Sequence, residues 1–338
     1  MSDPDLPQNK LGPYLAGVLD GFRGLQDITK FPGGQSNPTY LLTADSGEYV
    51  LRRKPFGKLL KSAHAVDREY RVIRALADSE VPVPRALHLC EDEDVIGAMF
   101  FVMSYVRARH FWDPALHELD NAGRSAIYDD MGRVLAALHS VDINAVGLGD
   151  FGPPGNYFER QVARWIKQYR ASETETVTDM DALIDWLPAN IPTDDGRVCL
   201  IHGDYRLDNI LFAPDSNKAI AVLDWELSTL GHPLADLAYQ CMQLRMPADS
   251  AIKGLAGVAR QALGIPSEEQ YVAAYCERTG LGEIRDWSFC LAFCFFRLAA
   301  ILQGVRKRAL DGNASSAKAL EYGSFVEPLA QMGAELIS

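Results

Sequence analysis

The hydrophobic pattern of the first hundred residues predicts short strands that alternate with turns. Five β-prone runs are bounded by turn residues such as Gly33-Gly34, Asp45-Ser46-Gly47 and the acidic stretch 91–94: 26–31, 39–43, 49–53, 86–90 and 98–105. Strand, glycine turn and strand in succession are typical of an antiparallel meander. Apolar positions at helical spacing predict helices at 11–22 and at about 63–78. We therefore expect a five-stranded unit that ends near Tyr105.

Helical periodicity dominates the remainder of the chain. The predicted helices are 122–140, 157–172, 178–187, 233–245, 267–279, 285–309 and 314–336, and the exception is a β-prone insert at 198–225. Together the two patterns predict an α+β protein. A small β-rich lobe would span residues 1–105, and a larger, mainly helical lobe would span residues 106–338.

Composition narrows the class of protein without naming an activity. The chain of 338 residues has 33 Lys and Arg against 45 Asp and Glu, a net charge of −12. This balance disfavours a general nucleic-acid binder, which carries a basic footprint. The apolar run 289–305 is interrupted by Arg297 and Gln303, so we expect a buried helix and no membrane span.

The cysteines and the first residues suggest a location. Six cysteines lack a paired spacing, and the first ten residues are polar with two prolines. We expect buried thiols in a reducing compartment and no targeting segment. The sequence therefore predicts a cytoplasmic protein with neither nucleic acid nor membrane as partner, and it leaves the oligomeric state open.

The strongest chemical signal lies in the β-prone insert. Residues 202–209 read HGDYRLDN, and residues 222–226 read VLDWE. Folded as a hairpin around the turn 214–217, the insert places Asn209 beside Asp224, two oxygen ligands that suit Mg²⁺ held partly by phosphate. Asp204 lies five residues before Asn209, where it could face a substrate hydroxyl. This Asp, Asn and second Asp match the base and metal ligands of eukaryotic-type kinases.

Cations upstream fit the same interpretation. Arg52 ends the third predicted strand, where kinases carry a phosphate-binding Lys, and Glu69 lies on the following helix, where the ion-pair partner belongs. Alternation along the strand gives Lys54 the same face as Arg52, so Lys54 is a second candidate phosphate ligand. Asp236 and His202 are expected to brace the loop, and a helix-terminal role is the alternative for Asp236.

These motifs resemble the aminoglycoside phosphotransferase and choline kinase superfamily. The resemblance covers residues 25–335. Four segments are similar to a narrower group, the kinase-like domains related to the N-terminal part of certain long-chain acyl-CoA dehydrogenases: GQSNPTY at 34–40, LRRKP at 51–55, SAHAVDREY at 62–70 and FRLAAI at 296–301. The resemblance implies a protein-kinase-like two-lobe fold and a nucleotide site. It places Met103 near adenine and gives backbone hydrogen bonds to adenine to Ser104–Val106.

The sequence departs from the kinase pattern at two places. The phosphate-covering loop is not G-x-G-x-x-G, so we expect Gly34 and Ser36 to hold phosphate through backbone amides and a hydroxyl. Arg52 replaces the Lys, which keeps the charge but changes its geometry. Arg206 stands where kinases carry a Lys that steadies the transferred phosphoryl group. A surface cation is the alternative for Arg206.

The resulting hypothesis is an ATP- and Mg²⁺-dependent phosphotransferase that acts on a small hydroxylated molecule. Only about ten residues separate Asp224 from the next helix, too few for a peptide-docking segment. The resemblance suggests a hydroxyacyl-CoA-type acceptor, with an aminoglycoside or a choline-like alcohol as alternatives. The candidates to line the acceptor site are aromatic and basic residues, and helix packing is the alternative for them: Tyr157, Arg160, Trp165, Tyr169, Arg170, Phe293 and Arg297. The alternative function is a catalytically silent nucleotide-binding or interaction module.

Overall fold

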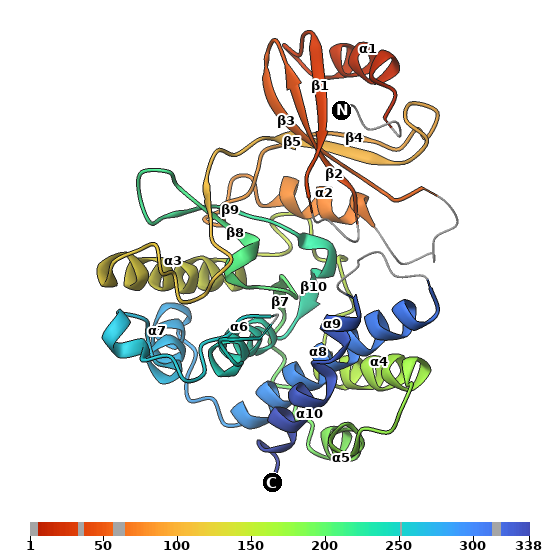
Figure 1. Cartoon of the computed structure of the whole chain (residues 1–338). Helices are drawn as coiled ribbons and strands as arrows, with labels where there is room; N and C mark the ends of the chain where they lie inside the picture. The colour runs from red at the N-terminus through yellow and green to blue at the C-terminus, as the bar shows by residue number, and fades with distance from the viewer. Residues whose placement is uncertain (1–5, 33–36, 57–64, 251, 313–318) are drawn as a thin grey trace. The chain divides into compact units, whose positions relative to one another are not determined.

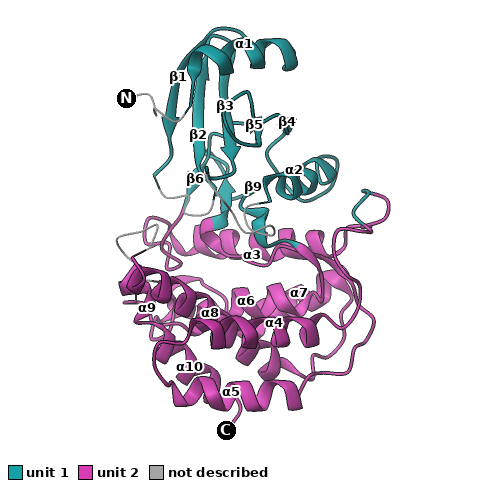
Figure 2. Cartoon of the chain, turned by 90° about the vertical axis from the view of Figure 1, so that its right-hand side faces the viewer, with its two compact units in different colours: residues 1–110, 146–148, 209–228 teal, residues 111–145, 149–208, 229–338 magenta. Residues whose placement is uncertain are grey.

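The computed structural model describes residues 6–32, 37–56, 65–250, 252–312 and 319–338. Contacts between Cα atoms divide the chain into two compact units, coloured separately in Figure 2. The first unit comprises residues 1–110, 146–148 and 209–228, and the second comprises 111–145, 149–208 and 229–338. Both units are discontinuous in sequence, whereas the predicted lobes were continuous, so the boundary at residue 105 stays a prediction.

The first unit contains the predicted five-stranded antiparallel sheet, whose strand order is β1-β2-β3-β5-β4. Its strands are β1 (Leu25–Lys30), β2 (Thr39–Ala44), β3 (Gly47–Arg53), β4 (Ala86–Cys90) and β5 (Phe100–Ser104). Helix α2 (Val66–Ala75) joins β3 to β4 in the sequence, as Figure 1 shows. The predicted strands and their order along the chain are confirmed.

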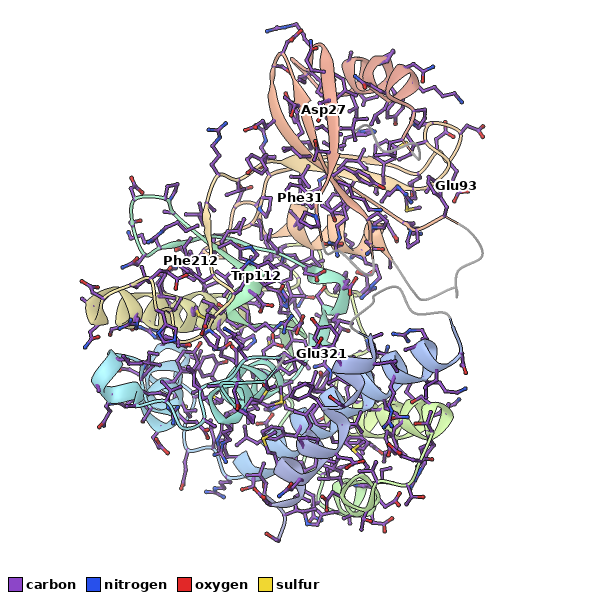
Figure 3. The ribbon with its side chains drawn as sticks, viewed as in Figure 1. Asp27, Phe31, Glu93, Trp112, Phe212 and Glu321 are labelled. Atoms are coloured by element: carbon purple, nitrogen blue, oxygen red, sulfur yellow. The ribbon has the colours of Figure 1, made fainter. Side chains whose placement is uncertain are left out.

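Alternation of side chains explains which face of this sheet is buried. Tyr40 and Leu42 of β2 are buried in the core. Ile28 of β1 is buried as well, whereas its neighbour Asp27, labelled in Figure 3, is exposed. Helix α1 (Gln8–Val18) adds buried leucines to the same core. We predicted this helix at 11–22, but it ends at Val18. The chain then turns through Gly21, whose φ of +77° is accessible mainly to glycine.

The β-prone insert is divided between the units. In the first unit, β8 (Ile210–Phe212) pairs with β9 (Ala219–Val222) and with β6 (Arg109–His110). In the second unit, β7 (Cys199–Ile201) pairs with β10 (Thr229–Gly231). Strand β10 was not predicted, because three residues are too few to show an alternating pattern.

The second unit is mainly helical. Its helices are α3 (Asn121–His139), α4 (Tyr157–Ser172), α5 (Thr178–Ala189), α6 (Leu234–Arg245), α7 (Glu268–Thr279), α8 (Trp287–Leu310), α9 (Ala319–Gly323) and α10 (Val326–Ala334), with a short 3₁₀ turn at Arg260–Leu263. Of two further 3₁₀ turns, Leu207–Asn209 lies where the chain passes into the first unit, and Trp225–Leu227 belongs to the first unit. The bounds agree with the predictions except at 314–336, which we predicted as one helix. Pro328 is consistent with the separate start of α10, because a proline lacks an N–H and is tolerated best in the first turn of a helix.

Helix α8 is the central apolar helix of this unit. It packs against α4, α5, α6, α9 and α10. Within the described residues, α8 alone is long and apolar enough to cross a membrane by length and composition, yet 78% of its most apolar window is buried inside the protein. The expectation of a buried helix at 289–305 is confirmed. All six cysteines are unpaired, and five of them are buried.

Candidate active site

The predicted site residues fall into two groups. The first unit holds those assigned to nucleotide and metal: Arg52, Glu69, Met103, Ser104, Val106, Asn209 and Asp224. The second unit holds Asp204 and Arg206. Gly34 and Ser36 lie outside the described residues. The loop that carries the Asp and Asn of the kinase-type motif therefore passes from the second unit to the first.

Arg52 and Glu69 form the predicted ion pair. Arg52 lies on β3 and Glu69 on α2, and the Arg52 Nε donates to Oε2 of Glu69 over 2.8 Å. The side chains are 11% and 2% exposed. Burial removes the hydration of both charged groups. Their mutual attraction and hydrogen bond at this distance compensate for that loss.

The same guanidinium also contacts the predicted metal ligand. The Arg52 Nη2 lies 2.5 Å from Oδ1 of Asp224 and 3.6 Å from Oε2 of Glu226. Glu226 also accepts a hydrogen bond from the side-chain amide of Asn37 at 3.4 Å. We predicted no role for Glu226 from the sequence. Its position two residues after Asp224 was the one signal that could have indicated a role. Arg52 thus contacts three carboxylates, which come from two segments far apart in sequence.

Burial and charge shift the pKa values of this cluster. Burial raises the pKa of Glu69 to about 7, against the attraction of Arg52 and with a further contribution from the negative charges of Asp224 and Glu226. Burial by itself lowers the pKa of Arg52, but Glu69, Asp224 and Glu226 outweigh it and raise that pKa. Arg52 is therefore a permanent cation.

Asn209 and Asp224 lie at the two ends of the β8–β9 hairpin. The register pairs Ile210 with Val222, and the Leu223 N–H donates to the Asn209 carbonyl over 2.8 Å. Asp224 has a φ of +64°, a left-handed conformation that Asp tolerates better than most residues. An amide oxygen beside a carboxylate fits Mg²⁺, which keeps water and phosphate oxygens as its other ligands. Within the described ranges, no cluster of three or more His, Cys, Asp or Glu side chains could hold a metal by itself.

The predicted adenine segment lies at the end of β5. Met103 is buried and pairs with Val50. The Ser104 N–H donates to the Arg85 carbonyl, and the Arg85 N–H donates to the Ser104 hydroxyl, both over 2.9 Å. The Ser104 amide is thus already engaged within the protein, whereas Tyr105 and Val106, the other members of the predicted set, are half-buried and lie outside any strand. The adenine role of the segment stays a prediction.

In the second unit, the loop after β7 is held by a buried carboxylate. Asp236, in the first turn of α6, accepts the backbone N–H groups of His202 at 2.6 Å and Gly203 at 2.8 Å. Gly203 has a φ of +84°, which a side chain would strain. The Asp204 N–H donates to Nδ1 of His202 over 3.1 Å. These bonds fix the backbone that carries Asp204.

His139 supports Asp236 from the end of α3. Its Nε2 lies 3.4 Å from Oδ2 of Asp236, and its Nδ1 lies 2.6 Å from the Tyr275 hydroxyl. Burial would raise the pKa of Asp236, but the hydrogen bond from His139, nearby imidazoles and the His202 amide together lower it. Asp236 is therefore an ionised anchor.

Asp204 has polar neighbours within the second unit. Its Oδ1 lies 3.4 Å from Nε of Arg206, whose Nη2 lies 2.9 Å from Asp208. The Tyr239 hydroxyl donates to Asp204, and burial together with this negative neighbour raises the pKa of Tyr239. The structure thus places a carboxylate and a guanidinium near one another on the loop, and their catalytic roles stay predictions.

Comparison with models of protein families shows the family of the chain. A model described as "Phosphotransferase enzyme family" matches residues 27–288. The chain belongs to the phosphotransferase enzyme family. Its kinase-like fold, with a five-stranded antiparallel sheet and a helical region, is that of the family.

Curated relatives of this phosphotransferase-family chain are longer proteins. It is 47% identical over 97% of its length to Acyl-CoA dehydrogenase family member 10 of Mus musculus, and 41% identical over 98% to Acyl-CoA dehydrogenase family member 11 of Homo sapiens. The chain covers 31% and 44% of these two relatives. It therefore spans less than half the length of the curated relatives it matches, in accord with the narrower group that the sequence resembles.

Solved structures share the phosphotransferase fold. A proposed aminoglycoside phosphotransferase from Ralstonia eutropha JMP134 matches with a TM-score of 0.89, 48% identity and 98% coverage of both chains. Aminoglycoside phosphotransferase APH(4)-Ia, solved with ADP and hygromycin B, matches with a TM-score of 0.62 and 14% identity, over 97% of this chain and 98% of that one. At that identity the second similarity shows the fold alone.

Proposed function

We propose that this chain transfers the γ-phosphoryl group of ATP, with Mg²⁺, to a hydroxyl of a small molecule. The observation that carries the proposal is the position of Arg52, which contacts both Glu69 and Asp224. A cation anchored on a helix carboxylate and directed toward the metal-binding Asp is the phosphate-binding arrangement of kinases. The solved relative with ADP supports a nucleotide as phosphoryl donor.

In the proposed reaction each residue has a defined part. The acceptor oxygen attacks the γ-phosphorus, the bond from that phosphorus to the β–γ bridging oxygen breaks, and ADP leaves. Asp204 orients the acceptor hydroxyl and takes its proton, and Arg52 binds nucleotide phosphates. Asn209 and Asp224 would hold Mg²⁺, which neutralises phosphate charge. Transfer of this kind depends mainly on positioning and electrostatic stabilisation.

The acceptor is a small molecule in this proposal. A 3₁₀ turn and the three-residue strand β10 fill the segment between Asp224 and α6, which leaves no room for a peptide-docking segment. The names of the curated relatives favour a hydroxyacyl-CoA-type acceptor. The aminoglycoside relatives make an aminoglycoside the alternative, together with choline-like alcohols.

An ADP-release assay over hydroxyacyl-CoAs, sugars, choline-like alcohols and aminoglycosides tests the function. We expect release that requires both Mg²⁺ and an acceptor, and loss of at least about 100-fold in Asp204→Asn. Asp215→Asn is the matched control, because Asp215 is exposed on the turn between β8 and β9. Full activity in Asp204→Asn would refute the assignment of the base.

Thermal unfolding with ATP separates an enzyme from a silent module. We expect ATP to stabilise the wild type mainly when Mg²⁺ is present, and Asp224→Asn to lose the Mg²⁺-dependent part. Metal-independent stabilisation would count against the metal ligands. Tight nucleotide binding without transfer to any acceptor would favour the silent nucleotide-binding module.

A further inference from the structure

Arg297 is a buried cation in an apolar helix. It is the one charged residue between Phe289 and Val305 of α8, and it is 5% exposed. A guanidinium keeps its charge in proteins, so its burial requires hydrogen-bond acceptors or an opposite charge to replace the lost hydration.

The partners of Arg297 in the protein are incomplete. Its Nη2 donates to the Gly203 carbonyl over 2.5 Å, and its Nε is buried without a partner. Among the residues that the structure describes, no carboxylate forms an ion pair with Arg297, and Asp204 acts on it only from beyond ion-pair distance. The segments outside the described ranges contain acidic residues only at Asp3 and Asp5.

Another buried arginine of the second unit shows the difference. Arg124 is 7% exposed, and its Nε donates to the carbonyls of Ala115 at 3.1 Å and Leu116 at 3.0 Å. Its Nη1 donates to the Asn121 side chain over 3.0 Å. Arg124 thus has acceptors suited to a structural role, whereas Arg297 retains capacity for a further acceptor.

The surroundings of Arg297 connect it to the proposed base. Its guanidinium carbon lies 5.7 Å from the ring centre of Trp165 on α4 and 5.4 Å from that of Tyr239 on α6. The Tyr239 hydroxyl donates a hydrogen bond to Asp204. Arg297 donates to the carbonyl of Gly203, the residue before Asp204. The aromatic faces stabilise the cation in part, but neither ring supplies a negative charge to pair with it.

We infer that Arg297 binds an anionic oxygen group of the acceptor, so that the phosphorylated molecule carries a carboxylate or phosphate as well as its hydroxyl. The inference rests on the proposed function and narrows its substrate class. A buried cation one side chain away from the base repels a cationic acceptor, which disfavours aminoglycosides and choline-like alcohols. The −12 net charge of the whole chain does not oppose this, because recognition depends on the local charge.

Matched acceptors test the inference. Hydroxybutanoates are compared with butanediols, and glycerol 3-phosphate with glycerol, so that each anion has a neutral counterpart; choline supplies the cationic class. We expect Arg297→Gln to lower kcat/KM for anionic acceptors about 10- to 100-fold, as for a lost charged hydrogen bond, and to change that of neutral acceptors less than about threefold. Arg308→Gln, at an exposed position of the same helix, is the control.

Thermal unfolding with the same compounds and ADP gives a readout that needs no transfer. Stabilisation by carboxylate or phosphate compounds in the wild type and not in Arg297→Gln supports the anion site, even if no phosphoryl transfer occurs and the proposed function fails. Transfer to neutral or cationic acceptors with equal efficiency overturns the inference and leaves the function intact. Absence of both anion stabilisation and anionic acceptors also overturns it.

Discussion

Arg52 and Glu69 are joined by a hydrogen-bonded ion pair whose carboxylate is 2% exposed. The pair is part of a larger cluster, because Arg52 also contacts Asp224 and Glu226. Burial, with a smaller contribution from the negative charges of Asp224 and Glu226, raises the pKa of Glu69 against the attraction of Arg52. The raised pKa gives the first unit a pH-dependent stability.

We expect the stabilising contribution of Glu69 to fall as the pH rises from about 4.5 to about 7. The folded protein keeps the Glu69 proton up to about pH 7, whereas the unfolded chain releases it near 4.5, so folding is favoured at the lower pH. Urea unfolding at pH 5 and pH 8 should show a loss about 2–3 kcal/mol larger in the wild type than in Glu69→Gln. If the unfolding free energy falls equally in the wild type and in Glu69→Gln, groups other than Glu69 cause the pH dependence.

Arg52→Lys is expected to destabilise the first unit by about 1–3 kcal/mol. The guanidinium donates to Glu69 through Nε and to Asp224 through Nη2, whereas a single ammonium cannot reproduce this fork. Urea unfolding measures the change. Arg107→Lys is the control, because Arg107 is exposed and contacts only Glu48 among the charged groups whose pairs are described. Because solvent screens an exposed ion pair, we expect Arg107→Lys to leave the unfolding free energy close to that of the wild type.

Asp236→Asn is expected to cost about 1–3 kcal/mol at pH 7, because one of two buried N–H donors then faces an amide NH₂. The pKa of Asp236 is lowered, so its stabilising effect exists above the ordinary value of 3.8 and disappears as the pH falls through the lowered value. Chemical unfolding compares this variant with Asp215→Asn. Equal stability of the two variants would show that Asp236 does not anchor the loop.

Gly203→Ala is expected to destabilise the protein by about 1–2 kcal/mol, since φ at this position is +84°. We expect phosphoryl transfer to fall as well, because Asp204 is the next residue. Gly282→Ala serves as the control: an added Cβ there meets no atom within 4 Å, and the backbone is not left-handed. Unfolding midpoints that move equally in both variants would contradict the role of backbone conformation.

Several elements were predictable because their signals are local. The sheet of the first unit follows from alternating residues and glycine turns, and the helices of the second unit follow from their 3.6-residue spacing. The split between α9 and α10 was missed, since apolar periodicity continues through the break. The pairing of Arg52 with Glu69 was predicted from motif order. The engagement of the Ser104 amide by Arg85 was not, because it depends on how β4 approaches β5.

By itself, the sequence determined the order of strands and helices and the loop that carries Asp204 and Asn209, because turn residues and periodicity act over a few positions. Only the tertiary structure decided that Glu226 shares Arg52 with Glu69 and Asp224. Only the tertiary structure decided, too, that Arg297 meets Gly203 with part of its donor capacity unused. The physical reason is that the packing of distant segments sets which charges are buried and which find partners.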